Sequence, residues 1–245
     1  IHMLVECKSK SELTDLYKDG KLIGRGTTAK VYLKNDQAIK VYRNTSRKRY
    51  VFNEFDMKTH LDELSEVKVK NIWTPNDIYI YEDEVKAISL DYIEGKTIRK
   101  EIPDVSLKLF LDYLKELKDN LRKLSEHKIW VVDFYCGNAI VNPNGINIID
   151  TDNFYFSDIS ISTCLEHNIS KILHEIFDEL FDFNKYFHFY SEYLDSLLII
   201  YFDIFASIEA DFDLYKALIS EFGEDTSLRD LKRLIKSIGE IDKTK

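Results

Sequence analysis

The amino-acid sequence predicts an α+β fold in which a β-rich N-terminal part precedes a helical C-terminal part, with a cleft expected between them. Residues 21–42 alternate apolar and polar side chains around glycines and a polar turn, a pattern typical of β-strands. Residues 77–93 repeat this alternation on either side of an acidic turn. After Gly95 the apolar residues recur every three or four positions instead, which indicates amphipathic helices.

The N-terminal part, residues 4–94, is predicted to form one domain, an antiparallel β-sheet lobe with one helix. Strands at 21–33 and 38–42 are joined by a Lys-Asn-Asp-Gln turn at residues 34–37, because Asn and Asp tolerate the backbone of tight turns. Residues 47–64 carry apolar groups at an approximate helical period and supply the helix.

The C-terminal part, residues 95–245, is predicted to form a second domain, a reduced helical lobe. Residues 106–128 place their leucines and a phenylalanine on one face, as a strongly amphipathic helix does. Residues 144–154 are predicted to form a turn and a short apolar strand that ends on acids. Four helices are predicted from about residue 162 onward, separated near Asn184, Ala210 and Gly223.

Composition limits the partners and the compartment. The most apolar run, residues 194–208, is interrupted by Asp195 and Asp203 and is shorter than the roughly 20 apolar residues of a membrane span, so it is interpreted as a buried helix. The net charge of -9 argues against a general nucleic-acid binder, whose affinity depends on Lys and Arg. Three scattered cysteines are too few for a disulfide framework or a zinc site. We therefore expect a cytoplasmic protein with neither nucleic acid nor membrane as its partner.

Three polar residues stand in segments that otherwise suit burial. Asp133 and Asn138 lie in the run VVDFYCGNAIV, and Asp150 closes a short apolar strand. Gly-Asn is also ordinary hairpin chemistry, so a simple turn is the alternative interpretation of the first pair. A carboxylate at the end of an apolar strand must be hydrated, paired or metal-bound, because burying it alone is very costly. Asn138 and Asp150 offer hard oxygen ligands that suit Mg²⁺, which leaves Asp133 to accept a hydroxyl proton.

Two further features suit a phosphate-bearing ligand. Gly24 and Gly26 lie at a strand turn, where glycines let backbone N–H groups approach phosphate oxygens closely. Tight hairpins use the same residues, so this signal is weak by itself. Lys40 lies in a predicted strand and Glu54 in the predicted helix. Each alone is typical of a solvated side chain, but together they suit an ion pair that aims the Lys40 ammonium at nucleotide phosphates.

In this order the motifs resemble those of the protein-kinase superfamily over roughly residues 20–155. Asp133 and Asn138 match the catalytic loop D-x-x-x-x-N, Asp150 matches the metal-binding Asp, and Lys40 and Glu54 match the strand Lys and its helix partner. The resemblance implies a bilobal protein-kinase-like fold that binds ATP and Mg²⁺. The residues that it implies at the nucleotide are Gly24, Gly26, Thr27, Thr28, Ala29, Val31, Ala38, Lys40 and Leu90, with the backbones of Asp91 and Ile93 at the adenine base.

The chain departs from that family at three places. Val131-Val132 replaces the His-Arg that precedes the catalytic Asp. Asp150-Thr151-Asp152 replaces Asp-Phe-Gly, with Asp152 either a supporting acid or a second metal ligand. Cys136-Gly137-Asn138 is similar to the Pro-Gly-Asn of aminoglycoside and other small-molecule phosphotransferases. The peptide-docking motifs of ordinary protein kinases are also missing, so the resemblance leaves the substrate class open.

These features together predict an ATP- and Mg²⁺-dependent kinase that transfers the γ-phosphate to a hydroxyl. In this hypothesis Lys40, held by Glu54, anchors phosphates, Asn138 and Asp150 hold Mg²⁺, and Asp133 is the base. The first expectation for the acceptor is a protein Ser or Thr, including one on the chain itself. The alternatives are a small-molecule phosphotransferase and a pseudokinase, a nucleotide-binding scaffold without turnover.

Overall fold

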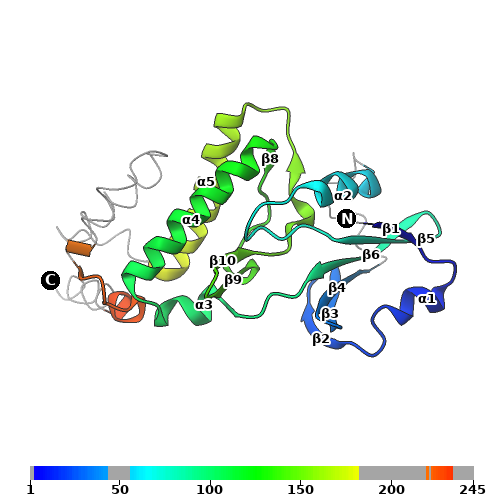
Figure 1. The fold of residues 1–245 in the computed structure, drawn as a ribbon, viewed down its shortest axis with the longest axis horizontal. Coiled ribbons are helices and arrows are strands. Elements are labelled where there is room, and N and C mark those ends of the chain that lie inside the picture. Colours follow the sequence, from blue (N-terminus) through cyan, green and yellow to red (C-terminus); the bar gives the residue numbers. More distant parts are fainter. Residues whose placement is uncertain (1–2, 44–55, 182–218, 221, 234–245) are drawn as a thin grey trace. The chain divides into compact units, whose positions relative to one another are not determined.

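The chain has an α+β fold with two compact units (Figure 1). The computed structural model describes residues 3–43, 56–181, 219–220 and 222–233. One unit contains the chain up to Glu94 together with Ile148–Tyr155, and the other contains Gly95–Asn147 and the chain from Phe156 onward. The chain therefore leaves the first unit after Glu94 and returns to it briefly with the segment that carries Asp150.

A six-stranded sheet forms the first unit, in the order β1-β5-β6-β4-β3-β2. The expectation of an antiparallel sheet is wrong for one strand, because β1 pairs in parallel with β5. The pairs β2–β3, β3–β4, β4–β6 and β5–β6 are antiparallel. Strand β1 was not predicted. The strands are β1 (Met3–Glu6), β2 (Lys21–Arg25), β3 (Ala29–Lys34), β4 (Gln37–Tyr42), β5 (Asp77–Tyr81) and β6 (Glu84–Asp91).

Two tight turns confirm the hairpins predicted in this sheet. Asn35 and Asp36 join β3 to β4 with φ of 50° and 60°, and Glu82 and Asp83 join β5 to β6 with φ of 53° and 59°. Two successive positive φ angles are the signature of a type I′ turn, whose twist matches that of the flanking strands. Asn and Asp adopt this backbone at lower cost than other side chains with a Cβ.

Each face of the sheet has its own apolar cluster and its own helix. Leu13 of helix α1 (Lys10–Asp15) and Leu16, which directly follows that helix, pack against a cluster that contains Ile39. Helix α2 (Met57–Glu66) brings Leu61 and Met57 against the opposite face. The described residues of the first unit thus form two α-helices, where one helix was predicted. The buried residues of the α2 face are Leu61, Ile78, Ile80, Ile88 and Leu90, and those of the α1 face are Ile39, Tyr79 and Ala87.

Helix α2 begins later than the predicted helix of residues 47–64. Asp56 has an extended backbone (ψ 112°), and its side chain accepts a hydrogen bond from the N–H of Lys58, so it caps the helix that starts at Met57. This geometry excludes a helix that continues unbroken through Asp56. Residues 47–55, and Glu54 with them, lie outside the described part of the chain.

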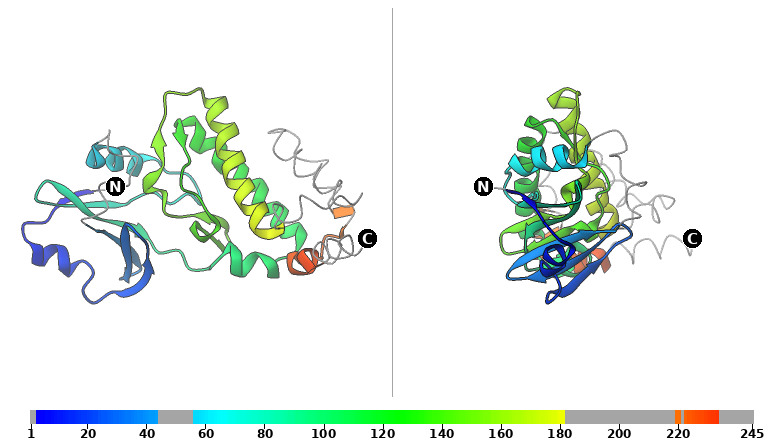
Figure 2. Two further views of the ribbon diagram at one scale, coloured as in Figure 1. Left: turned by 180° about the vertical axis from the view of Figure 1, so that it is seen from behind. Right: turned by 90° about the vertical axis from the view of Figure 1, so that its right-hand side faces the viewer.

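Two long helices, α4 (Leu107–Glu126) and α5 (Ile161–Phe181), lie side by side in the second unit (Figure 2). Helix α4 confirms the helix predicted over residues 106–128, and the Ser106 side chain caps its first turn by accepting from the N–H of Leu109. Its predicted apolar face is buried. That face consists of Leu107, Phe110, Leu111, Leu114, Leu117, Leu121 and Leu124.

Small sheets and short helices complete the second unit. One sheet has the order β10-β9-β7, and a second joins β11 to β8. Gly95 lies directly against β9, because a Cβ built there would be 2.5 Å from the carbonyl oxygen of Val141. The remaining elements are β7 (Lys96–Thr97), α3 (Ile98–Glu101), β8 (Ile129–Trp130), β9 (Ala139–Asn142), β10 (Gly145–Ile148), β11 (Tyr155–Phe156) and the 3₁₀ turns Ile102–Asp104 and Cys136–Asn138. A third 3₁₀ turn, Thr151–Asn153, belongs to the first unit.

Only part of the predicted C-terminal helical series falls within the described residues. The break at Gly223 is confirmed, since Gly223 has a φ of 83° and its N–H donates to the carbonyl of Ile219. The predicted breaks near Asn184 and Ala210, and the apolar run 194–208, lie outside that part. Across the described ranges, no helix is both long and apolar enough to span a membrane.

Candidate functional site

One face of the first unit's sheet carries most of the residues predicted to contact a nucleotide. Val31 lies opposite Lys40, and Ala38 lies opposite Leu90. Directly opposed residues point to the same side of a sheet, as do residues two apart along one strand. Ala29, Val31, Ala38, Lys40 and Leu90 therefore share one face. This is the face that α2 partly covers, and Leu90 and Ala38 belong to its apolar cluster.

Gly24 lies within β2, opposite Val31, and Gly26 opens the turn between β2 and β3; the local fold requires neither glycine. Gly26 donates its N–H to the carbonyl of Ala29 at 2.9 Å, and a Cβ at Gly26 would meet nothing nearer than that oxygen, 3.8 Å away. A Cβ at Gly24 would lie in ordinary contact with the side chain of Val31, at 3.4 Å. Thr27 and Thr28 form the tip of this turn. Neither glycine has a positive φ.

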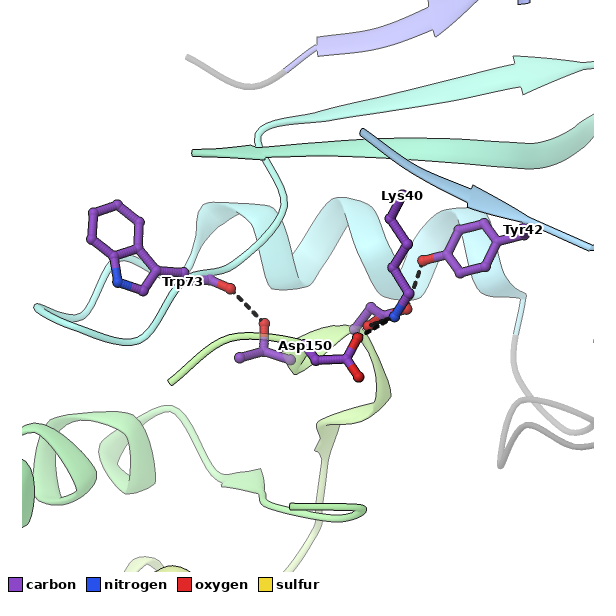
Figure 3. Close-up of polar contacts among 6 residues, drawn as sticks. Lys40, Tyr42, Trp73 and Asp150 are labelled. Carbon is purple, nitrogen blue, oxygen red and sulfur yellow. Dashed lines mark hydrogen bonds and ion pairs between the residues drawn. The ribbon is translucent and has the colours of Figure 1, made fainter. Parts of the chain in front are cut away.

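The Lys40 side chain is buried and is paired with two carboxylates (Figure 3). Its ammonium forms an ion pair with Oδ1 of Asp150 and a second with Oδ1 of Asp152, the latter at 2.7 Å. The same ammonium lies 5.7 Å from the centre of the Tyr42 ring. Burial alone lowers the pKa of Lys40, but the attraction of Asp152 and then Asp150 outweighs burial and raises it. Lys40 is therefore a fixed cation.

Asp152 is the fully enclosed member of this group. Its side chain is 1% exposed, and its Oδ2 accepts a hydrogen bond of 2.6 Å from the hydroxyl of Tyr42. Burial raises the pKa of Asp152, but the Lys40 ammonium and the Lys40 and Tyr42 hydrogen bonds outweigh it and lower the pKa. Asp152 is thus ionised at neutral pH, with one oxygen on Lys40 and the other on Tyr42.

Asp150 differs from Asp152 in both exposure and backbone. Its side chain is 38% exposed, and its backbone is left-handed, with a φ of 62°. Left-handed backbone is uncommon in residues other than glycine, and outside tight turns it often marks functional sites. Burial, followed by repulsion from the Asp152 carboxylate, raises the pKa of Asp150 despite the opposing attraction of Lys40.

Backbone and side-chain bonds hold the segment 150–152 on the first unit. The hydroxyl of Thr151 donates to the carbonyl of Trp73 at 2.8 Å, and the N–H of Trp73 donates to the carbonyl of Ile148 at 2.9 Å (Figure 3). The N–H of Ile148 in turn donates to the carbonyl of Asn71. The same segment contacts His60 on α2. Burial lowers the pKa of His60, although a hydrogen bond with the backbone of Asp152 and the charge of that residue act in the opposite direction. The segment is therefore tied to its unit on both sides of Asp150.

Asp133 and Asn138 lie in the second unit, in the loop between β8 and β9. Asp133 is exposed and has a left-handed backbone, with a φ of 52°. Asn138 is buried, and its N–H donates to the carbonyl of Tyr135 in the 3₁₀ turn. The simple two-residue hairpin that was the alternative interpretation is not formed, because the chain runs from β8 through this loop and turn into β9.

Helix α5 fixes the start of that loop by a contact that the sequence did not predict. Asn168 is completely buried; its Oδ1 accepts from the N–H of Val131 at 2.9 Å, and its Nδ2 donates to the carbonyl of Ile129 at 2.7 Å. The adjacent His167 bonds the carbonyl of Val131 through Nε2 at 2.8 Å and stacks on Trp130. Both backbone groups of Val131 are thus held, two residues before Asp133.

The predicted site residues have three outcomes. Lys40 and Asp150 are brought into contact, and the nucleotide-face residues are brought onto one face of the sheet. At the end of β6, Asp91 accepts a hydrogen bond of 2.8 Å from the Asn76 side chain, and Ile93 is half-buried beyond the strand. The predicted partner Glu54 lies outside the described part of the chain. Among the described residues Lys40 also pairs with Asp152, a partner that the sequence did not predict.

Asp150 is the carboxylate of this group that could hold a cation, since its side chain is 38% exposed. Within the ranges that the structure describes, no three His, Cys, Asp or Glu side chains are grouped to hold a metal ion. Mg²⁺ does not require such a group, because proteins usually bind it through one or two carboxylates, with substrate phosphates and water as the other ligands. Asp150 next to Lys40 fits that requirement.

Comparisons with known proteins supply no relative, since no protein-family model and no curated protein matches this chain. The chain is an α+β protein in which a buried Lys on one face of the N-terminal sheet is paired with two Asp side chains.

Proposed function

We propose that the chain is a kinase with a bilobal protein-kinase-like fold, which transfers the γ-phosphate of ATP, with Mg²⁺, to a hydroxyl group. The observation that carries this proposal is the Lys40 ammonium held between Asp150 and Asp152. A buried ion pair stabilises a fold little more than apolar residues of the same volume would, so the charge is better explained by a ligand than by packing. Phosphate groups are the ligands that a fixed ammonium suits best.

The electrostatics of the group favour a metal-bound nucleotide over a free anion. One ammonium and two carboxylates leave a formal charge of about −1 when all three are ionised. A bare triphosphate would be repelled by that charge, whereas a Mg²⁺–nucleotide complex brings its own compensating cation. When bound, Mg²⁺ would neutralise charge on the β- and γ-phosphates. Asp150 would hold it because that carboxylate is the exposed one, with Asn138 as the second ligand that the kinase resemblance implies.

The turn between β2 and β3 supports the same ligand. Its backbone tolerates a Cβ at both Gly24 and Gly26, so the local fold does not explain why glycine stands at these positions. Close approach of the backbone to phosphate oxygens does explain it, because a side chain at the turn would occupy the space that a phosphate needs. Thr27 and Thr28 would close over the nucleotide, with Ala29, Val31, Ala38 and Leu90 toward its base.

Asp133 is the residue that we assign to the acceptor. It is exposed in a left-handed backbone, and two residues earlier the backbone of Val131 is fixed by Asn168 and His167. A carboxylate on such a fixed loop would orient the acceptor hydroxyl and take its proton as the phosphoryl group transfers. Lys40 would meanwhile hold the α- and β-phosphates. Positioning and charge stabilisation would supply most of the rate enhancement.

The acceptor is proposed to be a protein Ser or Thr. One observation favours a second candidate, a small hydroxylated molecule. Tyr135 is 57% exposed two residues after Asp133, where Ser/Thr protein kinases tend to place a Lys, and an exposed ring suits stacking on a compact ligand.

Phosphate transfer from γ-labelled ATP would test the proposal, with the wild-type chain and Asp133→Asn each incubated with Mg²⁺. Generic protein acceptors, aminoglycosides and no acceptor would occupy separate lanes. Transfer that falls by at least about a hundredfold in the variant, the usual contribution of a general base, would support the kinase, and the labelled lane would give the acceptor class. Equal label in the wild type and the variant would overturn the role of Asp133.

A further inference from the structure

We infer that Asp152, held by Tyr42, is the positioning residue that anchors Lys40, and that Asp150 alone is the carboxylate that meets a cation. The inference rests on the proposed function and deepens it. The kinase resemblance implies Glu54 as the partner of Lys40 and leaves Asp152 as either a supporting acid or a second metal ligand. The contacts of the two Asp side chains distinguish between those roles.

The surroundings of Asp152 leave no place for a metal ion. One of its oxygens accepts from Lys40 at 2.7 Å, and the other accepts from Tyr42 at 2.6 Å. The side chain is 1% exposed, so a hydrated cation has no route to it. Each oxygen keeps a second lone pair, but a cation that used it would have to lose its water in this enclosed position, and Mg²⁺ loses its water reluctantly. Asp152 therefore acts on Lys40 and not on the metal.

Asp150 has the opposite character although it touches the same ammonium. Its side chain is 38% exposed, and its backbone is left-handed. Pairing at an exposed site is weaker than pairing in the interior, because water competes for both charges. When a metal-bound nucleotide binds, Lys40 would thus release Asp150 and contact the phosphates instead, while its ion pair with Asp152 remains.

The anchor is built from elements of the first unit only. Tyr42 follows Lys40 by two residues on β4, so both side chains project from the same face of the sheet. Thr151 lies between the two Asp residues, and its hydroxyl donates to the carbonyl of Trp73 (Figure 3). This bond helps to keep the Asp152 side chain beside Lys40. Among the described residues, the anchor of Lys40 is therefore Asp152 with Tyr42, all three in the first unit.

Acetylation of Lys40 in the full chain, measured by peptide mass spectrometry without nucleotide, would test the anchor directly. We expect Asp152→Asn to speed acetylation of Lys40 by at least about tenfold, the factor for losing one hydrogen bond to a charged group. Tyr42→Phe, which keeps the ring and so preserves packing, should speed it by about threefold. Asp150→Asn should change it by about threefold or less, because that pair is half-exposed.

Two matched controls separate the anchor from general effects. Asp19→Asn removes one exposed carboxylate from the same unit. Tyr32→Phe removes a hydroxyl from β3, the strand next to β4, and keeps the ring that stacks on Tyr17. Both should leave Lys40 acetylation unchanged. Circular dichroism would verify that each variant folds; if Asp152→Asn does not fold, the result from Tyr42→Phe decides. A larger effect from Asp150→Asn than from Asp152→Asn, or no effect from Tyr42→Phe, would overturn the inference.

A thermal-shift titration with Mg²⁺ and ATP keeps this inference distinct from the proposed function. If the wild type gains no stability from the nucleotide while the acetylation pattern holds, the nucleotide proposal fails and the anchor stands. If the nucleotide stabilises the wild type but the acetylation rates of the Asp152 and Tyr42 variants match the wild type, the anchor fails and nucleotide binding stands.

Discussion

The hydroxyl of Tyr42 donates a 2.6 Å hydrogen bond to Oδ2 of Asp152, whose Oδ1 accepts from the Lys40 ammonium at 2.7 Å. This arrangement places a cation, a buried carboxylate and a phenol in one connected group on an otherwise apolar sheet face. Such groups are strongly destabilised when a single member is lost, since the partner is left charged in a poorly solvated place. The site can therefore be tested through stability as well as through activity.

Asp152→Ala should lower the free energy of unfolding by about 3 kcal/mol, the lower end of the range for breaking a buried pair, because Asp150 remains beside Lys40. Since the folded pKa of Asp152 is lowered, its contribution is present above the unfolded pKa and is lost as pH falls through the folded pKa. Urea unfolding of both proteins at pH 7 and at successively lower pH would measure this. A loss below about 1 kcal/mol at pH 7 would contradict the buried network.

Asp150→Asn should have the opposite effect on stability. Burial and the nearby Asp152 carboxylate raise the pKa of Asp150, so its favourable contribution exists only when it is protonated and is lost as pH rises through the folded pKa. At pH 7 the ionised side chain lowers stability, and removing its charge should raise the free energy of unfolding by no more than about 1 kcal/mol, because the side chain is 38% exposed and water screens its charge.

The gain from Asp150→Asn should shrink as pH falls toward about 4, the ordinary pKa of Asp, because the wild type then becomes protonated too. Thermal melts across that pH range would follow the difference. A variant that is less stable than the wild type at pH 7 would show that Asp150 is a structural partner of Lys40 and not a carboxylate kept for a ligand.

Gly26→Ala should leave the fold intact and weaken nucleotide binding. A Cβ there meets only the carbonyl oxygen of Ala29, 3.8 Å away, so the free energy of unfolding should change by less than about 0.5 kcal/mol. The added methyl group would obstruct the backbone where phosphate oxygens are proposed to approach, and the Kd for ATP with Mg²⁺ should rise by about tenfold. Calorimetric titration gives the second quantity; an unchanged Kd would remove this turn from the site.

Gly95→Ala is the structural counterpart of that substitution. The new Cβ would lie 2.5 Å from the carbonyl oxygen of Val141 and 2.6 Å from Cγ2 of Ile140, so β9 must shift to accept it. Overpacking of this kind costs about 1–3 kcal/mol. Gly26→Ala is the matched control, because both substitutions lower the conformational entropy of the unfolded chain to a similar extent. Equal melting temperatures for the two variants would show that Gly95 is not in close contact with β9.

Asn168→Leu should destabilise the second unit. The substitution leaves the N–H of Val131 and the carbonyl of Ile129 buried with fewer partners, at a cost of about 1–3 kcal/mol for each group. His167→Phe, which retains stacking on Trp130 but loses the bond to the Val131 carbonyl, should cost less. Chemical unfolding of the two variants would rank them, and the reverse order would refute the assigned contacts.

Local patterns predicted the elements with strong local causes. Asn35 and Asp36 predicted a tight turn because their side chains tolerate a left-handed backbone, and the spacing of the leucines after Ser106 predicted α4. Strand β1 was missed because its partner, β5, lies more than seventy residues away, and four residues without strong alternation carry no signal of their own. Short helix α1 was missed although Ser9 and Glu12 at its start are a capping signal.

Within the candidate site, the sequence singled out Lys40 and Asp150 by motif order but not the residues that hold them. Lys40 and Asp150 are in contact, and their proposed roles stay a prediction. Asp152 with Tyr42, and Asn168 with Val131, are contacts across long stretches of chain that no local pattern encodes. The one available signal was positional: Tyr42 follows Lys40 by two residues on an alternating strand, which places both on one face.

The decisive measurement is a calorimetric titration of ATP into the wild-type chain, with and without Mg²⁺, and into Lys40→Met. We expect saturable binding that requires Mg²⁺ and that weakens by at least about tenfold when the fixed ammonium is removed. Heat that does not saturate in the wild type, or equal affinity for Lys40→Met, would contradict the claim that the Lys40–Asp150–Asp152 group is a nucleotide site.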